Sequence, residues 1–148
     1  MSEEQSLHQV SEMSAMESFN VLKGDPHASL IDVRTQAEWA YVGVVDLSSL
    51  GKKPLFHQWQ VFPSMQVDAD FVPRLQASLA AVGAGADAPL LFLCRSGVRS
   101  LAAGRAMAAA GHSRCINVTG GFEGPPDAKQ HRGQVSGWKA SALPWMQT

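Results

Sequence analysis

Apolar runs alternate with helical patterns along the chain, and each run has the length of a single strand. Leu90–Leu93 is an unbroken apolar run, which is typical of a central parallel strand buried on both faces. Ser29–Asp32 and Cys115–Val118 predict two further strands, and Leu55–Val61, which mixes aromatic and β-branched residues, predicts another. Strands that alternate with helices favour an α/β fold with a mostly parallel central sheet.

Capping signals predict where the first two helices begin. Ser14–Glu17 and Thr35–Glu38 both have the spacing of a capping box, in which two side chains and two backbone N–H groups bond reciprocally. The first helix is expected to end near Gly24, where a glycine can terminate it. The second is short and is expected to run through Trp39.

Two more helices are expected in the second half of the chain. Asp70 can cap a helix that runs to about Val82, and Pro73 is tolerated in its first turn. Val98–Ala110 predicts a further helix, ended by Gly111. The apolar residues that define its expected buried face are Val98, Leu101, Ala102, Ala106 and Ala109.

Composition indicates one globular domain over residues 1–148. The chain has 45% hydrophobic and 17% charged residues, with 12 Lys plus Arg against 13 Asp plus Glu. A chain of this length buries roughly 68–70% of the surface that its unfolded form exposes, so it can build a core without cross-links. The balanced charge gives no support for a nucleic-acid partner, which usually requires a strongly basic domain.

The cysteine and histidine content excludes several kinds of site. Cys94 and Cys115 are the two cysteines, so a disulfide framework is excluded and a four-thiolate zinc site cannot form. The five histidines have no metal-ligand spacing, and we therefore expect no metal and no cofactor. The acidic start resembles no secretory signal, and no window approaches the ~20 apolar residues of a membrane span. We expect a soluble cytoplasmic protein with no membrane partner.

The segment that carries chemistry is Leu93–Ser100, where a strand ends and a helix begins almost at once. Ligands of open α/β sheets bind at the carboxyl ends of strands, which is where Cys94 lies. The free N–H groups and the dipole of the helix start, with Arg95 and Arg99 nearby, favour a thiolate. Gly97 lets the loop curl around the sulfur. The pattern predicts a nucleophilic cysteine in an anion-binding loop; the alternative is a buried structural cysteine that ends a strand.

The spacing of the loop bears on its reaction. Four residues separate Cys94 from Arg99, whereas loops of the Cys-X5-Arg kind, which bind phosphate or arsenate, are one residue longer. A tighter loop suits a persulfide sulfur held on Cys94. A phosphatase or an arsenate reductase is therefore the less favoured interpretation.

Three ordered blocks of the chain resemble the rhodanese (sulfurtransferase) family in its single-domain form. Cys94–Ser100 resembles the active-site loop of that family, and Ile31–Arg34 followed by Glu38–Trp39 resembles its early signature. The closing signature is similar to three segments that lie in order along the chain: Asn117–Phe122, Gly137–Trp138 and Leu143–Trp145. The resemblance covers a core of about residues 14–145.

The chain departs from the family pattern in two loops. Val42–Asp46 lacks the histidine that usually follows the Glu-Trp pair. Glu123–Ser136 is an insertion between the closing blocks, and the Gly- and Pro-rich stretch Glu123–Trp138 predicts a long loop. Both departures bear on the substrate more than on the class of reaction.

The resemblance implies a rhodanese-like fold, with helices on both faces of the sheet, and a ping-pong transfer of sulfur. Cys94 would attack the sulfane sulfur of a small anionic donor such as thiosulfate or a persulfide, and hold it as a persulfide. The acceptor would be a thiol, cyanide or a protein cysteine. A non-catalytic or partner-specific interaction module is the alternative from a different class.

The resemblance also implies roles for the residues around Cys94. The expected substrate-binding residues are Arg95, Ser96, Gly97, Val98, Arg99 and Ser100. Arg95 is the favoured contact for an anionic donor, whereas Arg99 either contacts substrate or pairs with Asp32 or another carboxylate. Asp32 and Arg34 are expected to support the loop as an ion pair or, for Arg34, to help bind substrate. Cys115 is favoured as an inert buried thiol, with a resolving or sulfur-accepting role as the alternative.

Overall fold

A five-stranded parallel sheet forms the centre of the computed structural model, which describes residues 9–61 and 63–147. The strands stand in the order β1 (Ser11–Met13), β8 (Cys115–Val118), β7 (Leu90–Leu93), β2 (Ser29–Asp32) and β4 (Leu55–Phe56). Strand β7 lies in the middle, and all four of its residues are fully buried. The predicted central strand and its two parallel neighbours are therefore confirmed.

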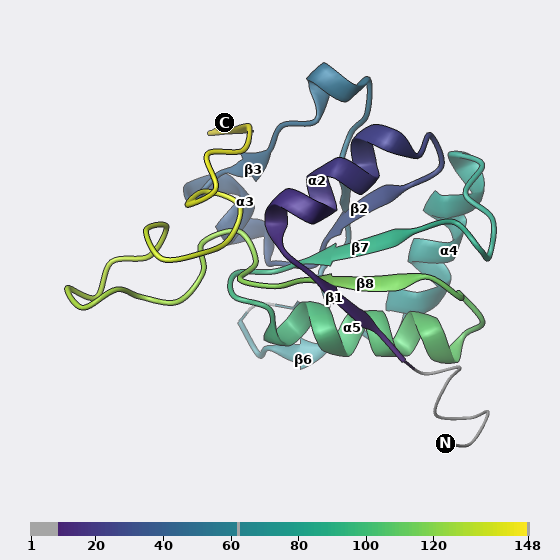
Figure 1. The fold of residues 1–148 in the computed structure, drawn as a ribbon. Coiled ribbons are helices and arrows are strands. Elements are labelled where there is room, and N and C mark those ends of the chain that lie inside the picture. The colour runs from purple at the N-terminus through teal and green to yellow at the C-terminus, as the bar shows by residue number, and fades with distance from the viewer. Residues whose placement is uncertain (1–8, 62, 148) are drawn as a thin grey trace.

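Helices cover both faces of this sheet, as predicted (Figure 1). Helix α2 (Ala15–Gly24) packs on one face, and α4 (Phe71–Ala81) and α5 (Val98–Ala109) pack on the other. Neighbouring residues of β7 alternate between the two apolar clusters: Leu91 lies in the cluster with α2, and Phe92 in the cluster with α4 and α5. A strand buried on both faces therefore has no polar side.

Both predicted capping boxes are present. Ser14 Oγ accepts from the Glu17 N–H at 3.1 Å, and the Glu17 carboxylate accepts from the Ser14 N–H at 3.3 Å. The same reciprocal pair joins Thr35 and Glu38 at the start of α3 (Gln36–Tyr41). Asp70 stands at the cap position of α4, but its side chain makes no capping hydrogen bond.

The predicted strand Leu55–Val61 is two short strands in different sheets. Strand β4 ends at Phe56, whereas β5 (Gln60–Val61) pairs antiparallel with β6 (Gln66–Val67) in a hairpin. Between them Trp59 packs edge-on against Phe71 of α4, with ring centroids 5.1 Å apart.

The expected buried face of α5 is wrong. Val98 is 78% exposed, and the buried residues of the helix are Ser100, Ala103, Gly104, Met107 and Ala108. A Cβ built on Gly104 would lie 3.4 Å from the Phe92 ring of β7, so the smallest side chains let the helix approach the sheet closely. Close approach, rather than side-chain hydrophobicity, determines which face is buried.

The remaining elements lie outside the five-stranded sheet. Strand β3 (Val44–Val45) pairs antiparallel with β9 (Trp145–Met146), and a single 3-10 turn, η1 (Ser48–Leu50), follows β3. The residues between β8 and β9 form neither helix nor strand, which confirms the predicted loop, and Figure 1 shows this segment extending from the body of the domain. Within residues 9–61 and 63–147, no helix has the length and apolar character of a membrane span.

Candidate active site

Cys94 lies directly after the central strand, where the sheet ends and α5 begins. The residue is 1% exposed, so its thiol is recessed below the surface. The Gly97 N–H donates to Cys94 Sγ at 3.1 Å, and Ser100 Oγ lies 3.2 Å from the same sulfur. Gly97 caps α5 with a φ of +116°, which a residue with a Cβ rarely adopts. The loop therefore points a backbone donor and a helix start at one thiol.

A second segment holds the carbonyl groups of the loop. The Phe122 N–H donates to the Cys94 carbonyl at 2.8 Å, and the N–H groups of Glu123 and Gly124 both donate to the Arg95 carbonyl at 3.0 Å. These bonds hold both carbonyl oxygens towards the 122–124 segment, while the Gly97 N–H is turned towards the sulfur. The orientation suits a negative charge on Cys94.

Asn117 of β8 connects the loop to the far edge of the sheet. Its Nδ2 donates to the Gly97 carbonyl at 3.1 Å and to the Glu12 carboxylate at 3.1 Å, and its Oδ1 accepts from Ser100 Oγ at 2.5 Å. Ser100 Oγ thus lies within hydrogen-bond distance of both Asn117 Oδ1 and the Cys94 sulfur, and its one proton can be donated to either acceptor. Sequence reasoning gave Asn117 no role, although a polar residue inside the apolar run Cys115–Val118 is a signal for one.

A pocket of about 380 Å³ opens onto Cys94. Its lining comprises five of the predicted residues, Cys94, Arg95, Ser96, Val98 and Arg99, together with Glu38, Gln60 and Met65. Gln60 and Met65 come from the β5–β6 hairpin, which sequence reasoning did not predict, and so neither was a candidate. The predicted residues Gly97 and Ser100 contact the sulfur from the protein side.

Arg99 pairs with Glu38 of α3. Its two terminal nitrogens donate to the two carboxylate oxygens at 2.6 and 2.9 Å, and both side chains are about four-fifths buried. Burial alone would raise the pKa of the Glu38 carboxyl, but the hydrogen bonds and charge of Arg99, with bonds from Thr35, together lower it. The hydrogen bond with Glu38 raises the pKa of Arg99 in turn. Of the two roles open to Arg99, pairing with a carboxylate is the one observed, and the carboxylate is not Asp32.

Asp32 and Arg34 form a buried ion pair behind the loop. Arg34 Nε and Nη2 donate to the Asp32 carboxylate at 2.9 and 2.7 Å, and both residues are fully buried. The Arg34 guanidinium also donates to the Gly43 carbonyl at 2.8 Å and stacks 4.3 Å from the Phe122 ring centre. Neither residue lines the Cys94 pocket. The ion pair considered for these two residues is thus present, and it contacts Phe122, whose N–H donates to the Cys94 carbonyl.

Cys115 opens β8 and is buried away from the pocket. Burial raises the pKa of its thiol to about 12, from an ordinary value of 9.0. The folded state thus favours the neutral thiol, and the reactive thiolate accumulates only as the pH approaches 12.

We therefore expect iodoacetamide at about pH 8 to leave Cys115 unmodified in the native protein and to label it once the protein is unfolded in guanidinium. Peptide mapping of the native Cys94→Ser variant, in which Cys115 is the one remaining cysteine, checks this directly. Rapid native labelling of Cys115 would contradict the assignment of an inert buried thiol.

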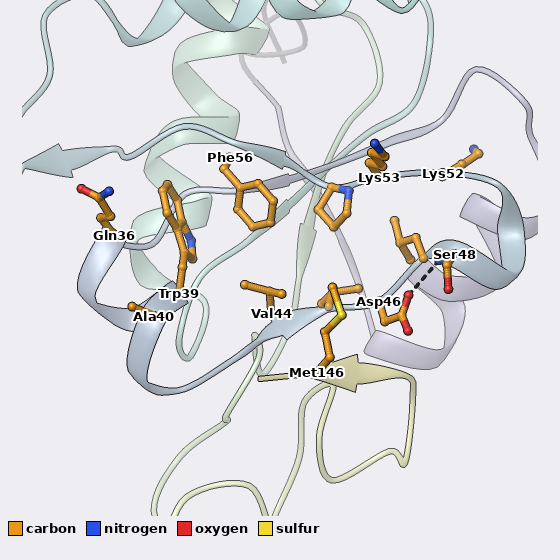
Figure 2. Close-up of a pocket in the computed structure, with 13 residues that line it drawn as sticks. Gln36, Trp39, Ala40, Val44, Asp46, Ser48, Lys52, Lys53, Phe56 and Met146 are labelled. Atoms are coloured by element: carbon orange, nitrogen blue, oxygen red, sulfur yellow. Dashed lines mark hydrogen bonds between the residues drawn. The ribbon is translucent and has the colours of Figure 1, made fainter. Parts of the chain in front are cut away.

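A larger apolar groove of about 660 Å³ lies on the other side of α3. Figure 2 shows Trp39 and Phe56 along one wall, with Val44 and Met146 opposite. Trp39 and Phe56 pack edge-on, with centroids 5.0 Å apart. None of the candidate catalytic residues lines this groove, so α3 separates it from the chemistry: Glu38 faces the cysteine pocket and Trp39 faces the groove.

The chain belongs to the rhodanese-like domain family, whose model matches residues 15–124. The match ends at Gly124, which is the last residue of the segment that holds the Cys94 loop and lies two residues into the inserted segment. The resemblance stated from the three sequence blocks is thereby confirmed, and so is the fold that it implied.

Individual relatives cover nearly the whole chain. The uncharacterized protein RP600 of Rickettsia prowazekii is 34% identical over 136 residues, which span 92% of this chain and 97% of the relative. The crystal structure of Rv0390 from M. tuberculosis is 37% identical, covers 94% of this chain and 98% of its own, and superposes with a TM-score of 0.82. A polysulfide-sulfur transferase homodimer from Wolinella succinogenes, 19% identical over 97% of this chain and 82% of its own, shares the fold with a TM-score of 0.59.

Proposed function

We propose that the protein is a sulfurtransferase that carries a sulfane sulfur on Cys94. The observation that carries the proposal is the position of the Cys94 sulfur, which accepts from the Gly97 N–H at 3.1 Å at the start of α5. A donor and a helix start aimed at one sulfur favour an anion there, whether it is a thiolate or a persulfide. Membership of the rhodanese-like family supports the same class of reaction.

The proposed reaction has two half-reactions. The Cys94 thiolate attacks the outer sulfur of a donor such as thiosulfate or a persulfide. A new sulfur–sulfur bond forms to Cys94, the donor's own bond to that sulfur breaks, and its electron pair departs on sulfite or a thiolate. A thiol, cyanide or protein-cysteine acceptor then attacks the outer sulfur of the persulfide and regenerates the Cys94 thiolate.

Two alternatives make different demands on the same loop. A phosphatase or arsenate reductase needs room for a tetrahedral oxyanion, whereas this loop is one residue shorter than the Cys-X5-Arg kind and Arg99 is engaged by Glu38. A non-catalytic interaction module needs no nucleophile, whereas this loop retains Cys94 with a backbone donor directed at it.

Intact-mass spectrometry after incubation with a panel of sulfane donors tests the proposal. We expect the wild-type protein to gain about one sulfur atom, the Cys94→Ser variant to gain none, and the Cys115→Ser variant, its matched control, to gain as much as wild type. Subsequent addition of cyanide is expected to remove the added sulfur. Absence of a persulfide with every donor would overturn the proposal, and hydrolysis of an aryl phosphate would favour the phosphatase.

We also propose a cytoplasmic location and a small anionic sulfur donor. A reducing compartment keeps both cysteines as free thiols, which the chemistry of Cys94 requires.

A further inference from the structure

The charge of the Cys94 pocket is smaller than its two arginines suggest. Arg99 is held by both oxygens of Glu38, so within the described residues Arg95 is the lining cation that forms no ion pair. The Glu38 carboxylate itself lines the pocket and has a lowered pKa, so it stays ionised at neutral pH. A dianion such as thiosulfate would therefore meet one exposed cation and a fixed carboxylate.

The walls of the pocket favour a substrate with an apolar body. Met65 of the β5–β6 hairpin and Val98 of α5 line the pocket and are 37% and 78% exposed, so a ligand at the mouth would cover apolar surface. The volume of about 380 Å³ falls within the range of pockets that take organic ligands and greatly exceeds the share of one water molecule. Met65 is unbranched and polarizable, which suits contact with aromatic and sulfur-containing groups.

We propose that Glu38 is a specificity-determining residue that selects monoanionic organic sulfur donors over inorganic dianions, with Met65 contacting the organic body. This inference rests on the proposed sulfur transfer at Cys94. Glu38 acts in two ways: it cancels the charge of Arg99, and it repels a second negative charge on the donor.

Three donors with the same reacting group separate the effect of the donor's charge from the effect of its apolar part. They are thiosulfate, methanethiosulfonate and benzenethiosulfonate, the latter two as their thiosulfonate anions. In each, the Cys94 thiolate bonds to the terminal sulfur, the bond from that sulfur to the sulfonyl sulfur breaks, and the electron pair leaves on sulfite or on the sulfinate. Two anionic reactants give two anionic products of the same total charge, and no external oxidant is consumed. The measured quantity is the second-order rate constant for persulfide formation on Cys94, so no acceptor is needed.

Glu38→Gln removes the charge and keeps the helix start, because glutamine also completes a capping box. We expect the rate constant of this variant to be roughly fivefold higher with thiosulfate and to change by less than about twofold with methanethiosulfonate. A roughly fivefold change is the size expected from removing one unit charge near a partly exposed site. Glu17→Gln is the matched control, since Glu17 has the same capping role in α2 and lies outside the pocket. It is expected to alter none of the three rates.

Met65→Ala tests the apolar contact independently of Glu38. We expect this variant to lower the rate constant with benzenethiosulfonate roughly fivefold relative to that with methanethiosulfonate. The rate constant with thiosulfate is expected to stay within about twofold of the wild-type value. Unchanged rate ratios in both folded variants would overturn the inference while Cys94 still forms a persulfide. Absence of a persulfide with all three donors would instead overturn the proposed sulfur transfer, and the inference with it.

Discussion

Gly121→Ala is expected to destabilise the fold by about 2 to 5 kcal/mol and to disorganise the Cys94 loop. Gly121 has a φ of +61°, and a Cβ there would lie 2.4 Å from the Cys94 carbonyl oxygen and 2.7 Å from the Arg95 carbonyl carbon. Those atoms are backbone, so no side-chain rotation relieves the overlap. The loop would have to move away from the segment that braces it, and the Gly97 N–H would lose its alignment with the sulfur.

Gly51→Ala is the matched control for this change. Gly51 has a similar φ of +69° with no heavy atom near the position of an added Cβ, so alanine there costs conformational strain alone, about 1 to 2 kcal/mol. Urea unfolding of both variants, with the rate of Cys94 alkylation as a second readout, measures the difference. Equal stability losses in the two variants would show that the close approach at Gly121 is unimportant.

Asp32→Ala is expected to cost about 3 to 5 kcal/mol, because it leaves the Arg34 guanidinium buried without its counter-ion. The carboxylate accepts three side-chain hydrogen bonds and the Arg34 N–H, and no solvent can replace it. A double variant, Asp32→Ala with Arg34→Met, is expected to recover part of the loss, since it removes the stranded charge and fills the space.

The exposed ion pair between Arg74 and Asp68 supplies the comparison. The Arg74 side chain is 48% exposed, so Arg74→Ala is expected to cost about 1 kcal/mol or less. Chemical denaturation at neutral pH gives the free energies of unfolding of the wild type, the Asp32→Ala variant, the double variant and the Arg74→Ala variant. A loss below about 1 kcal/mol for Asp32→Ala would mean that water reaches the guanidinium and that the pair does not support the loop.

Features of the fold determined by neighbouring residues were predictable from the sequence. The capping boxes at Ser14 and Thr35 join residues three positions apart, and the buried strand Leu90–Leu93 needs no partner to be recognised. The loop around the candidate nucleophile was recognisable for the same reason, because Cys94 and the Gly97 donor are three residues apart.

Features that depend on distant contacts were not predictable. The partner of Arg99 is 61 residues away in the chain, and sequence reasoning could specify only some carboxylate. The face of α5 that packs on the sheet follows from how closely Gly104 approaches Phe92, which periodicity does not reveal. Met65 reaches the pocket through a hairpin of two-residue strands, whose pairing leaves little trace in the sequence pattern.

The interactions that shape the Cys94 loop also bear on the order of events in folding. They involve three distant parts of the chain. Glu12, near the amino end of the described chain, bonds Asn117, which bonds the loop; Glu38 bonds Arg99; and the segment Phe122–Gly124 bonds the loop carbonyls. Contacts between distant residues form slowly, because closing each long loop of chain costs entropy. We therefore expect a partly folded chain to lack the arrangement around Cys94, which is complete only when strands from both halves have joined the central one. The sulfur chemistry proposed for Cys94 would in this way be coupled to completion of the fold.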